Sequence, residues 1–200
     1  MKLTWYGHAC FLLETTEGSA VFDPYAPGSV PGLELPEIRA DAVFCSHGHR
    51  DHAYEQAVAL SGNNPGFRVT RIPCFHDEKD GALRGENTIH VIEAEGKRVA
   101  HLGDLGHVPD EAALAALRGL DVLMIPVGGY YTIDAKTADA VANAVGARLV
   151  VPMHFRGEGF GYDVLARVED FLKLRGEVLR LDGNGFDPAE IPGKATVVFG

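Results

Sequence analysis

The chain has 200 residues, of which 46% are hydrophobic and 23% are charged, a composition typical of one globular domain rather than a disordered or fibrous chain. Its 18 basic and 28 acidic residues give a formal net charge of −10, which disfavours long nucleic acid as a partner. No apolar run approaches the roughly 20 residues that span a bilayer, and no export signal precedes the first strand-like segment. We therefore expect a cytoplasmic protein with a single domain over residues 1–200 and no membrane partner.

Turn residues divide the first half of the chain into short extended segments that are typical of strands. The predicted strands are residues 3–14, 19–22, 42–46, 67–75, 88–93, 98–102, 122–127, 148–153, 177–181 and 195–199. A glycine-containing turn between the fifth and sixth of these predicts a hairpin. Helical periodicity marks residues 53–60, 109–117, 134–145 and 162–174, and residues 28–36 and 157–161 are predicted as loops. This order of elements predicts an α/β or α+β fold in which helices cover sheets.

The most informative stretch is His47-Gly48-His49-Arg50-Asp51-His52, which follows a predicted strand and precedes a predicted helix. His47 and His49 point to the same side of an extended chain, and the turn that follows brings Asp51 and His52 beside them. Four side chains of metal-ligand type within six residues indicate a metal site. The alternative is a solvated polar loop.

With this motif the sequence resembles the metallo-β-lactamase-fold hydrolases, and most closely their short bacterial and archaeal metal-dependent hydrolases, related to the ascorbate-phosphate lactonase group. The likeness is also carried by Trp5-Tyr6-Gly7-His8-Ala9, Phe22-Asp23-Pro24, Phe75-His76, Leu102-Gly103-Asp104, Ile125-Pro126-Val127-Gly128-Gly129 and Val151-Pro152-Met153-His154. The resemblance implies a four-layer αββα sandwich with a metal site at one edge of its two sheets.

The resemblance also implies a set of ligands for two divalent metal ions. His47, His49 and His76 would bind the first ion, Asp51, His52 and His154 the second, and Asp104 would bridge them. Zinc is expected because imidazole suits it, with manganese or iron as alternatives. Taken alone, His76 and His154 could be ordinary core or surface histidines, and Asp104 could cap a turn.

Other residues are assigned by the resemblance or by their place near predicted strand ends. Asp23 resembles a structural aspartate that orients a ligand, although an Asp-Pro turn explains it equally well. His8 and His107 could face the cleft as proton donors or substrate contacts, and a satisfied polar position is the equal alternative for each. His90 and His101 receive no role.

Arg84, Tyr130 and Tyr131 are candidate substrate-binding residues because they follow predicted strand ends near the ligands. Arg84 could grip a phosphate or carboxylate, and the tyrosines could line the pocket or donate to an oxyanion. The alternative is a solvated arginine and packed aromatic side chains. The three cysteines, Cys10, Cys45 and Cys74, are expected to be reduced and not to bind metal.

These features predict a dinuclear hydrolase in which a metal-bridging hydroxide attacks an ester, lactone or phosphodiester of a small anionic substrate, with Asp51, Asp104 and His8 in the catalytic set. The length leaves no room for the helical domain of glyoxalase-type thioesterases or for the insertions of RNA-processing relatives. The diiron oxygen reducers of the family usually have glutamate at the position of His49, and this difference argues against redox chemistry. A phosphodiesterase or small nuclease, and a non-catalytic metal-binding module, stay open as alternatives, as does self-association.

Overall fold

The computed structural model describes residues 1–199, which form two large β-sheets, one two-stranded sheet, three α-helices and two 3₁₀ helices. The five-stranded sheet has the order β13 (Gly185–Phe186), β1 (Lys2–Trp5), β2 (Phe11–Thr15), β3 (Gly18–Phe22) and β5 (Ala42–Phe44). The seven-stranded sheet has the order β12 (Val178–Leu181), β14 (Ala195–Phe199), β11 (Leu149–Met153), β10 (Val122–Pro126), β9 (Lys97–His101), β8 (Glu86–Ala94) and β7 (Arg68–Phe75).

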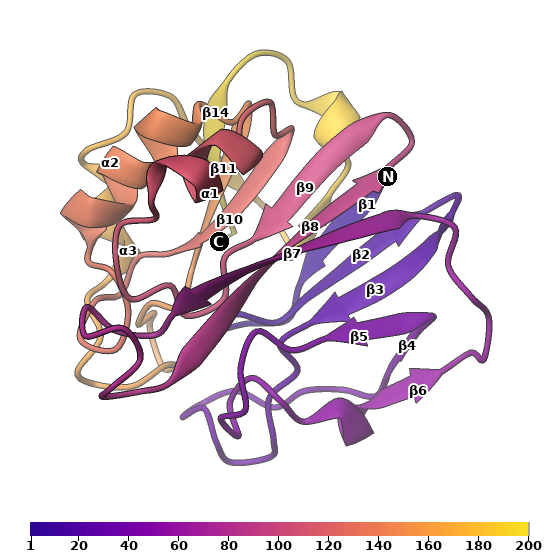
Figure 1. Ribbon diagram of the computed structural model, residues 1–200. Helices are drawn as coiled ribbons and strands as arrows, with labels where there is room; N and C mark the ends of the chain where they lie inside the picture. The colour runs from indigo at the N-terminus through magenta and orange to yellow at the C-terminus, as the bar shows by residue number, and fades with distance from the viewer. Residues whose placement is uncertain (200) are drawn as a thin grey trace.

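The two large sheets pack face to face around the central core, as Figure 1 shows. Successive residues of a strand point to opposite faces, so a strand buried on both sides contributes to two cores. In β10, Val122 and Met124 pack toward the five-stranded sheet, while Leu123 and Ile125 pack toward the helices. This double burial explains why β10 is apolar throughout.

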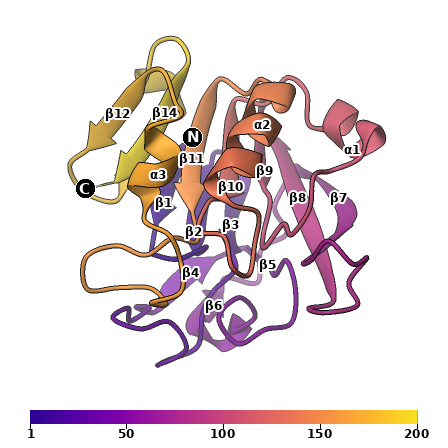
Figure 2. The ribbon, with the colours of Figure 1, turned by 90° about the vertical axis from the view of Figure 1, so that its left-hand side faces the viewer.

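Three helices cover the outer face of the seven-stranded sheet: α1 (Glu111–Ala116), α2 (Ala135–Val145) and α3 (Val168–Leu172). Figure 2 shows all three on the same side of this sheet. Asp134 caps α2 by accepting a hydrogen bond from the Thr137 amide at 2.8 Å. Asp110 caps α1 in the same way, so Pro109 precedes the cap instead of occupying the first helical position.

The fourth layer covers the outer face of the five-stranded sheet and contains little helix. It consists of residues 24–37, the two-stranded sheet of β4 (Ile38–Ala40) and β6 (Val58–Leu60), and the 3₁₀ helix η1 (Glu55–Ala57). The predicted helix over residues 53–60 is wrong, because Val58 pairs with Ile38 in a strand and is buried in the core of this layer. Tertiary packing here overrides a short helical pattern.

Two other predicted elements are divided or shortened. The predicted strand 3–14 is two strands joined by a tight turn at Gly7, whose φ is 97°. The predicted helix 162–174 is helical only in α3, and the residues before it form a loop. The hairpin of β8 and β9 is confirmed, with Ala94 opposite Lys97, as are the later strands. The second 3₁₀ helix, η2 (Pro188–Glu190), precedes β14.

The α/β class and the layered sandwich are confirmed by this architecture. Within residues 1–199, no helix has the length and apolar character needed to cross a membrane. The carboxyl ends of β3, β5, β7, β9 and β11 all lead into loops that carry the motif residues. The fold therefore brings segments that are far apart in sequence to one edge of the sandwich.

Candidate metal centre

The seven predicted ligands come from four loops that leave strand ends at this edge. His76 directly follows β7, and His154 directly follows β11. Asp104 follows β9 after two residues, and the six-residue histidine motif follows β5. Glycines allow these loops to approach closely, since a Cβ on Gly106 would lie 2.2 Å from the His76 carbonyl carbon.

The side chains form two groups that meet at Asp104. In each group, one donor atom from every member lies within 4.8 Å of the others; the first group is His47, His49 and His76, and the second is His8, Asp51, His52 and His154. The Asp104 Oδ2 atom lies 3.3 Å from the Nε2 atoms of His52 and His76. It lies 3.2 Å from Nε2 of His154 and 4.0 Å from Nε2 of His47. Asp104 therefore contacts histidines of both groups. Asp23 also comes near both groups, since it lies with His47 and His52 in a third group of possible ligands.

These separations fit divalent metal ions. Two ligands of a tetrahedral zinc ion, each about 2.0–2.1 Å from it, lie about 3.3 Å from one another. Several buried donors also lack a hydrogen-bond partner within the described part of the chain, among them His47 Nε2, His52 Nε2 and Asp104 Oδ1. Because buried polar atoms are normally paired, these free donors indicate a cation site.

Asp23 lies directly beneath the histidine motif and is fully buried. Its carboxylate accepts hydrogen bonds from the Ser46 amide at 2.7 Å and the Ser46 hydroxyl at 2.6 Å. It also lies 2.8 Å from Nδ1 of His52, which sets that ring with Nε2 toward Asp104. Burial raises the pKa of Asp23, but His101 and His52 outweigh it and lower the pKa to about 2. This geometry matches the orienting role and not that of a simple Asp-Pro turn.

The protonation of most groups at the site suits metal binding. Burial and the neighbouring His52 lower the pKa of His47 to about 3, and burial lowers the pKa of His76. His52 is the exception: burial opposes its protonation, but Asp104 and Asp23 raise its pKa well above the usual value, so a metal ion there competes with a proton. Burial opposes ionisation of Asp104, but His154 and His52 hold its pKa well below the usual range. Neutral imidazoles and ionised carboxylates are the forms that bind divalent ions.

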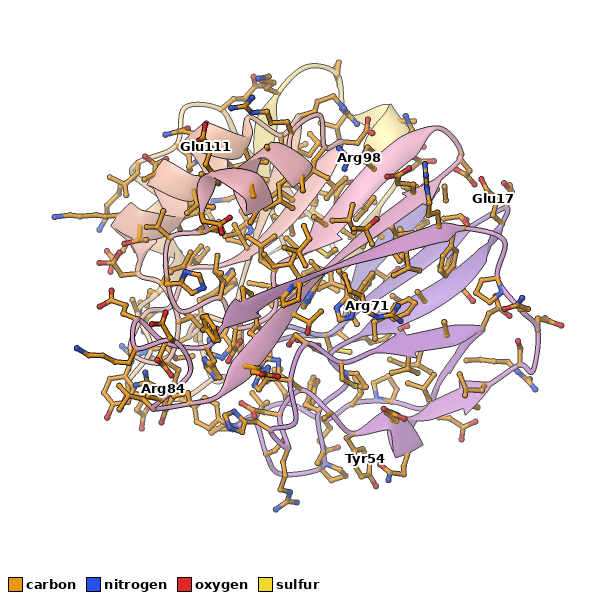
Figure 3. The ribbon with its side chains drawn as sticks, viewed as in Figure 1. Glu17, Tyr54, Arg71, Arg84, Arg98 and Glu111 are labelled. Atoms are coloured by element: carbon orange, nitrogen blue, oxygen red, sulfur yellow. The ribbon has the colours of Figure 1, made fainter. Side chains whose placement is uncertain are left out.

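A cavity of 260 Å³ opens above the ligands. It is lined by His49, Asp51, His76, Arg84, Asp104, Tyr131, His154 and Tyr162. Arg84 donates a hydrogen bond to the Tyr130 carbonyl at 3.0 Å, and its guanidinium lies 5.7 Å from the centre of the Tyr131 ring. Figure 3 shows Arg84 at the end of the sandwich opposite Glu17 and Arg98. Of the three predicted substrate-binding residues, Arg84 and Tyr131 reach this cavity, while Tyr130 is 64% exposed and borders an adjoining cavity of 320 Å³.

The loop that carries Arg84 is built around Asp77, which the sequence analysis missed. The buried Asp77 carboxylate accepts four backbone hydrogen bonds, from the amides of Lys79, Gly81, Leu83 and Arg84, at 2.7–3.2 Å. Burial opposes ionisation, but these donors lower the pKa of Asp77. An acidic residue next to a ligand and before a glycine-containing loop was the available signal.

Tyr162 lines the cavity and was also missed by the sequence analysis, because it fell at the start of a predicted helix. It lies instead in the loop before α3, where Gly161 hydrogen-bonds to the Pro31 carbonyl. The Tyr162 hydroxyl donates to the Ser29 carbonyl at 2.6 Å and lies 3.2 Å from Oδ2 of Asp51. Long-range loop packing of this kind leaves no local sequence signal.

The remaining candidates lie outside the cavity. The His8 side chain is fully buried beside Asp51 and does not line it. His107 accepts a hydrogen bond from the Phe75 amide, and His101 lies buried behind Asp23. The Cys74 thiol accepts a hydrogen bond from Asn87, and none of the three cysteines, all within the described residues, forms a disulfide.

Comparisons with known proteins agree with this geometry. A family model described as a beta-lactamase superfamily domain matches residues 2–154. A UPF0173 metal-dependent hydrolase of Methanoregula boonei is 33% identical over an alignment 188 residues long, and the match covers 78% of this chain and 82% of that protein. A Thermotoga maritima crystal structure, assigned as a Zn-dependent hydrolase of the metallo-β-lactamase superfamily, has a TM-score of 0.77 at 35% identity and covers 99% of this chain and 98% of its own. A metallo hydrolase of Ignicoccus hospitalis, 21% identical with a TM-score of 0.64 over 86% of this chain and 89% of its own, shares the fold.

Proposed function

Because the chain belongs to the metallo-β-lactamase superfamily, whose relatives here are named metal-dependent hydrolases, we propose that it hydrolyses an ester, lactone or phosphodiester of a small anionic substrate with two divalent metal ions. The observation that carries this proposal is the pair of donor groups that meet at Asp104. A structural site needs only four ligands, so this larger set favours a catalytic centre.

In this proposal His47, His49 and His76 hold the first ion, and Asp51, His52 and His154 hold the second, with Asp104 between them. Zinc is the proposed metal because the donors are mostly imidazoles. The assignment of the Thermotoga maritima relative as Zn-dependent supports this choice.

When bound, the two ions would lower the pKa of water near neutral pH and polarise the substrate oxygen. The protein's own contribution is to hold the donors in place before substrate arrives. Asp23 fixes His52 with its Nε2 atom toward Asp104. Tyr131 and Tyr162 line the cavity, and their rings occupy space beside the donors that water would otherwise fill.

The charge distribution supports a small anionic substrate. Two divalent ions outweigh the Asp51 and Asp104 carboxylates, and Arg84 adds a further positive charge beside the cavity. The whole chain has a formal net charge of −10. Extended polyanions are therefore repelled, while the local positive field at the cavity attracts small anions. A cavity of 260 Å³ is also suited to a small molecule.

The test compares catalytic efficiency on matched anionic and neutral esters, together with lactones and bis-p-nitrophenyl phosphate. We expect the parent to prefer the anionic ester and Arg84→Ala to lose roughly tenfold or more of that preference, the scale of one charge-assisted contact. Arg68→Ala is the matched control, because Arg68 is 76% exposed at the start of β7 and forms its ion pair with Glu93, away from the cavity lining. Preference for the neutral ester in the parent contradicts the proposed substrate charge. Turnover of the phosphodiester alone favours a phosphodiesterase, and no turnover of any ester favours a metal-binding module.

A further inference from the structure

His8 lies in the turn between β1 and β2, and its imidazole is fully buried against the second donor group. Its Nε2 atom lies 3.4 Å from Oδ2 of Asp51. Its ring centre lies 4.1 Å from that of His154 and 5.1 Å from that of His52. His8 therefore belongs to this group by distance, although the predicted ligands did not include it.

Neither ring nitrogen of His8 has a hydrogen-bond partner in the described part of the chain. The 3.4 Å separation from Asp51 exceeds the about 2.7–2.9 Å of a charge-assisted hydrogen bond. It matches the distance of about 3.3 Å between two ligands of one tetrahedral zinc ion. A fully buried imidazole with two free nitrogens is rare in native proteins, and a bound cation accounts for it.

The backbone of this turn fixes the position of His8. His8 has a φ of 52°, in the left-handed region that few residues other than glycine adopt. Its carbonyl accepts hydrogen bonds from the His154 amide at 3.2 Å and from the Trp5 indole at 3.1 Å. The turn is thus attached to the strand end that carries a proposed ligand, His154.

We propose that His8 is a ligand of the second metal ion, beside Asp51, His52 and His154. This inference rests on the proposed function, in which a second ion is bound there. With His8, the second ion would have one more protein donor than the first.

A ligand role also explains why His8 does not line the cavity. A proton donor must come within hydrogen-bond reach of the leaving group, directly or through one water. The His8 side chain is fully buried, so it lies beneath the donors and not beside the substrate. Proton donation by His8 is therefore the competing outcome of the test.

The experiment uses metal-stripped protein reloaded with Co²⁺, followed by calorimetry and visible absorption. The variants are His8→Asn, since Asn tolerates a positive φ, and His8→Phe, which keeps the volume of the ring. His49→Asn is the matched loss of a donor from the first group, and His107→Asn is a histidine change outside both groups. Circular dichroism and the melting temperature of the metal-free proteins show whether each variant is folded.

We expect the parent to bind two Co²⁺ ions, and both His8 variants to bind one of them at least tenfold more weakly with an altered spectrum for that ion. His49→Asn should weaken the other ion, and His107→Asn should change neither. Parental affinity and spectra for both ions in a folded His8 variant would overturn the inference, and a leaving-group-dependent loss of kcat would then identify His8 as a proton donor. If the parent binds a single ion, the dinuclear proposal fails. The inference then holds only if the His8 variants weaken that ion.

Discussion

Asp104 has a different position from every other donor at the site, because its Oδ2 atom lies within 4.0 Å of histidines from both groups. Its carboxylate is 3% exposed, and its Oδ1 atom has no hydrogen-bond partner among residues 1–199. A buried carboxylate with this many imidazole neighbours and a free oxygen is suited to bridging two ions.

Asp104→Ala should therefore lower the occupancy of both metal ions, because one carboxylate contributes to both sites. His49→Ala should lower the occupancy of the first ion only, since His49 belongs to one group. Elemental analysis after dialysis against metal-free buffer measures both effects. Loss of a single ion in Asp104→Ala would remove Asp104 from the bridging role.

At the scale of single residues, the six-residue histidine motif predicts a metal site from the sequence alone, because its four donors are close together in the chain. The assignment of three further ligands rests on the resemblance to the family, since each follows a different strand and the fold brings them together: His76, Asp104 and His154. Tyr162 was not predictable, because it reaches Asp51 through loop contacts with residues more than a hundred positions away.

At the scale of elements, the loop over residues 77–85 has one organising side chain. Asp77 accepts four backbone hydrogen bonds, and two of them come from Leu83 and Arg84. The position of the Arg84 guanidinium beside the cavity therefore depends on a carboxylate that does not line it.

Asp77→Asn should raise KM for the anionic ester several-fold, because an amide accepts fewer backbone hydrogen bonds and Arg84 loses its position. It should leave kcat on the neutral ester and the metal content unchanged. Glu78→Gln, in the same loop and exposed, is the matched control. An equal change on both esters would show that Asp77 supports the fold and not Arg84 alone.

The junction of β4, β5 and β6 depends on another carboxylate, Asp41. It accepts hydrogen bonds from the Ser19 amide at 2.7 Å, from the Ser19 and Ser61 hydroxyls, and from Asn63. Hydrogen bonds from Ser61 and Ser19 lower the pKa of Asp41 from its usual 3.8 to about 2. Because the folded pKa is depressed, the ionised group stabilises the fold above about pH 4, and this contribution is lost as the pH falls toward 2.

Asp41→Asn should lower the free energy of unfolding near pH 6 by about 1 kcal/mol, a modest value because Asp41 is partly exposed and screened. The difference between parent and variant should shrink between pH 4 and pH 2. Urea unfolding of the metal-free proteins at several pH values measures it, and removing the metal separates Asp41 from the metal ligands. A difference that stays constant down to pH 2 would contradict the assigned pKa.

The sequence predicted most strands but not the outer layer over the five-stranded sheet. The apolar strands β10, β11 and β14 are buried on both sides, so their composition alone is informative. Residues 53–60 have a helical pattern that is too short to outweigh strand pairing between β4 and β6. The length of α3 likewise follows from the loop before it, which packs on residues 28–33.

At the scale of the whole molecule, the sandwich places the loops that carry the proposed ligands at one edge of its two sheets. Parallel strands β9, β10 and β11 end at the same edge, where the loops of the five-stranded sheet also end. Sites at the carboxyl ends of parallel strands are common because many side chains converge there from a rigid support. Figure 1 shows the two sheets and their covering helices from which these loops extend.

Two divalent ions bound at this edge of the sandwich would act together in hydrolysis. Metal content by elemental analysis during stepwise reloading of metal-stripped protein tests this directly, with hydrolysis of an anionic ester followed in the same samples. We expect two ions per chain in metal-replete buffer and full activity only when both are bound. A content that stays at or below one ion per chain, or full activity with one ion, would contradict it.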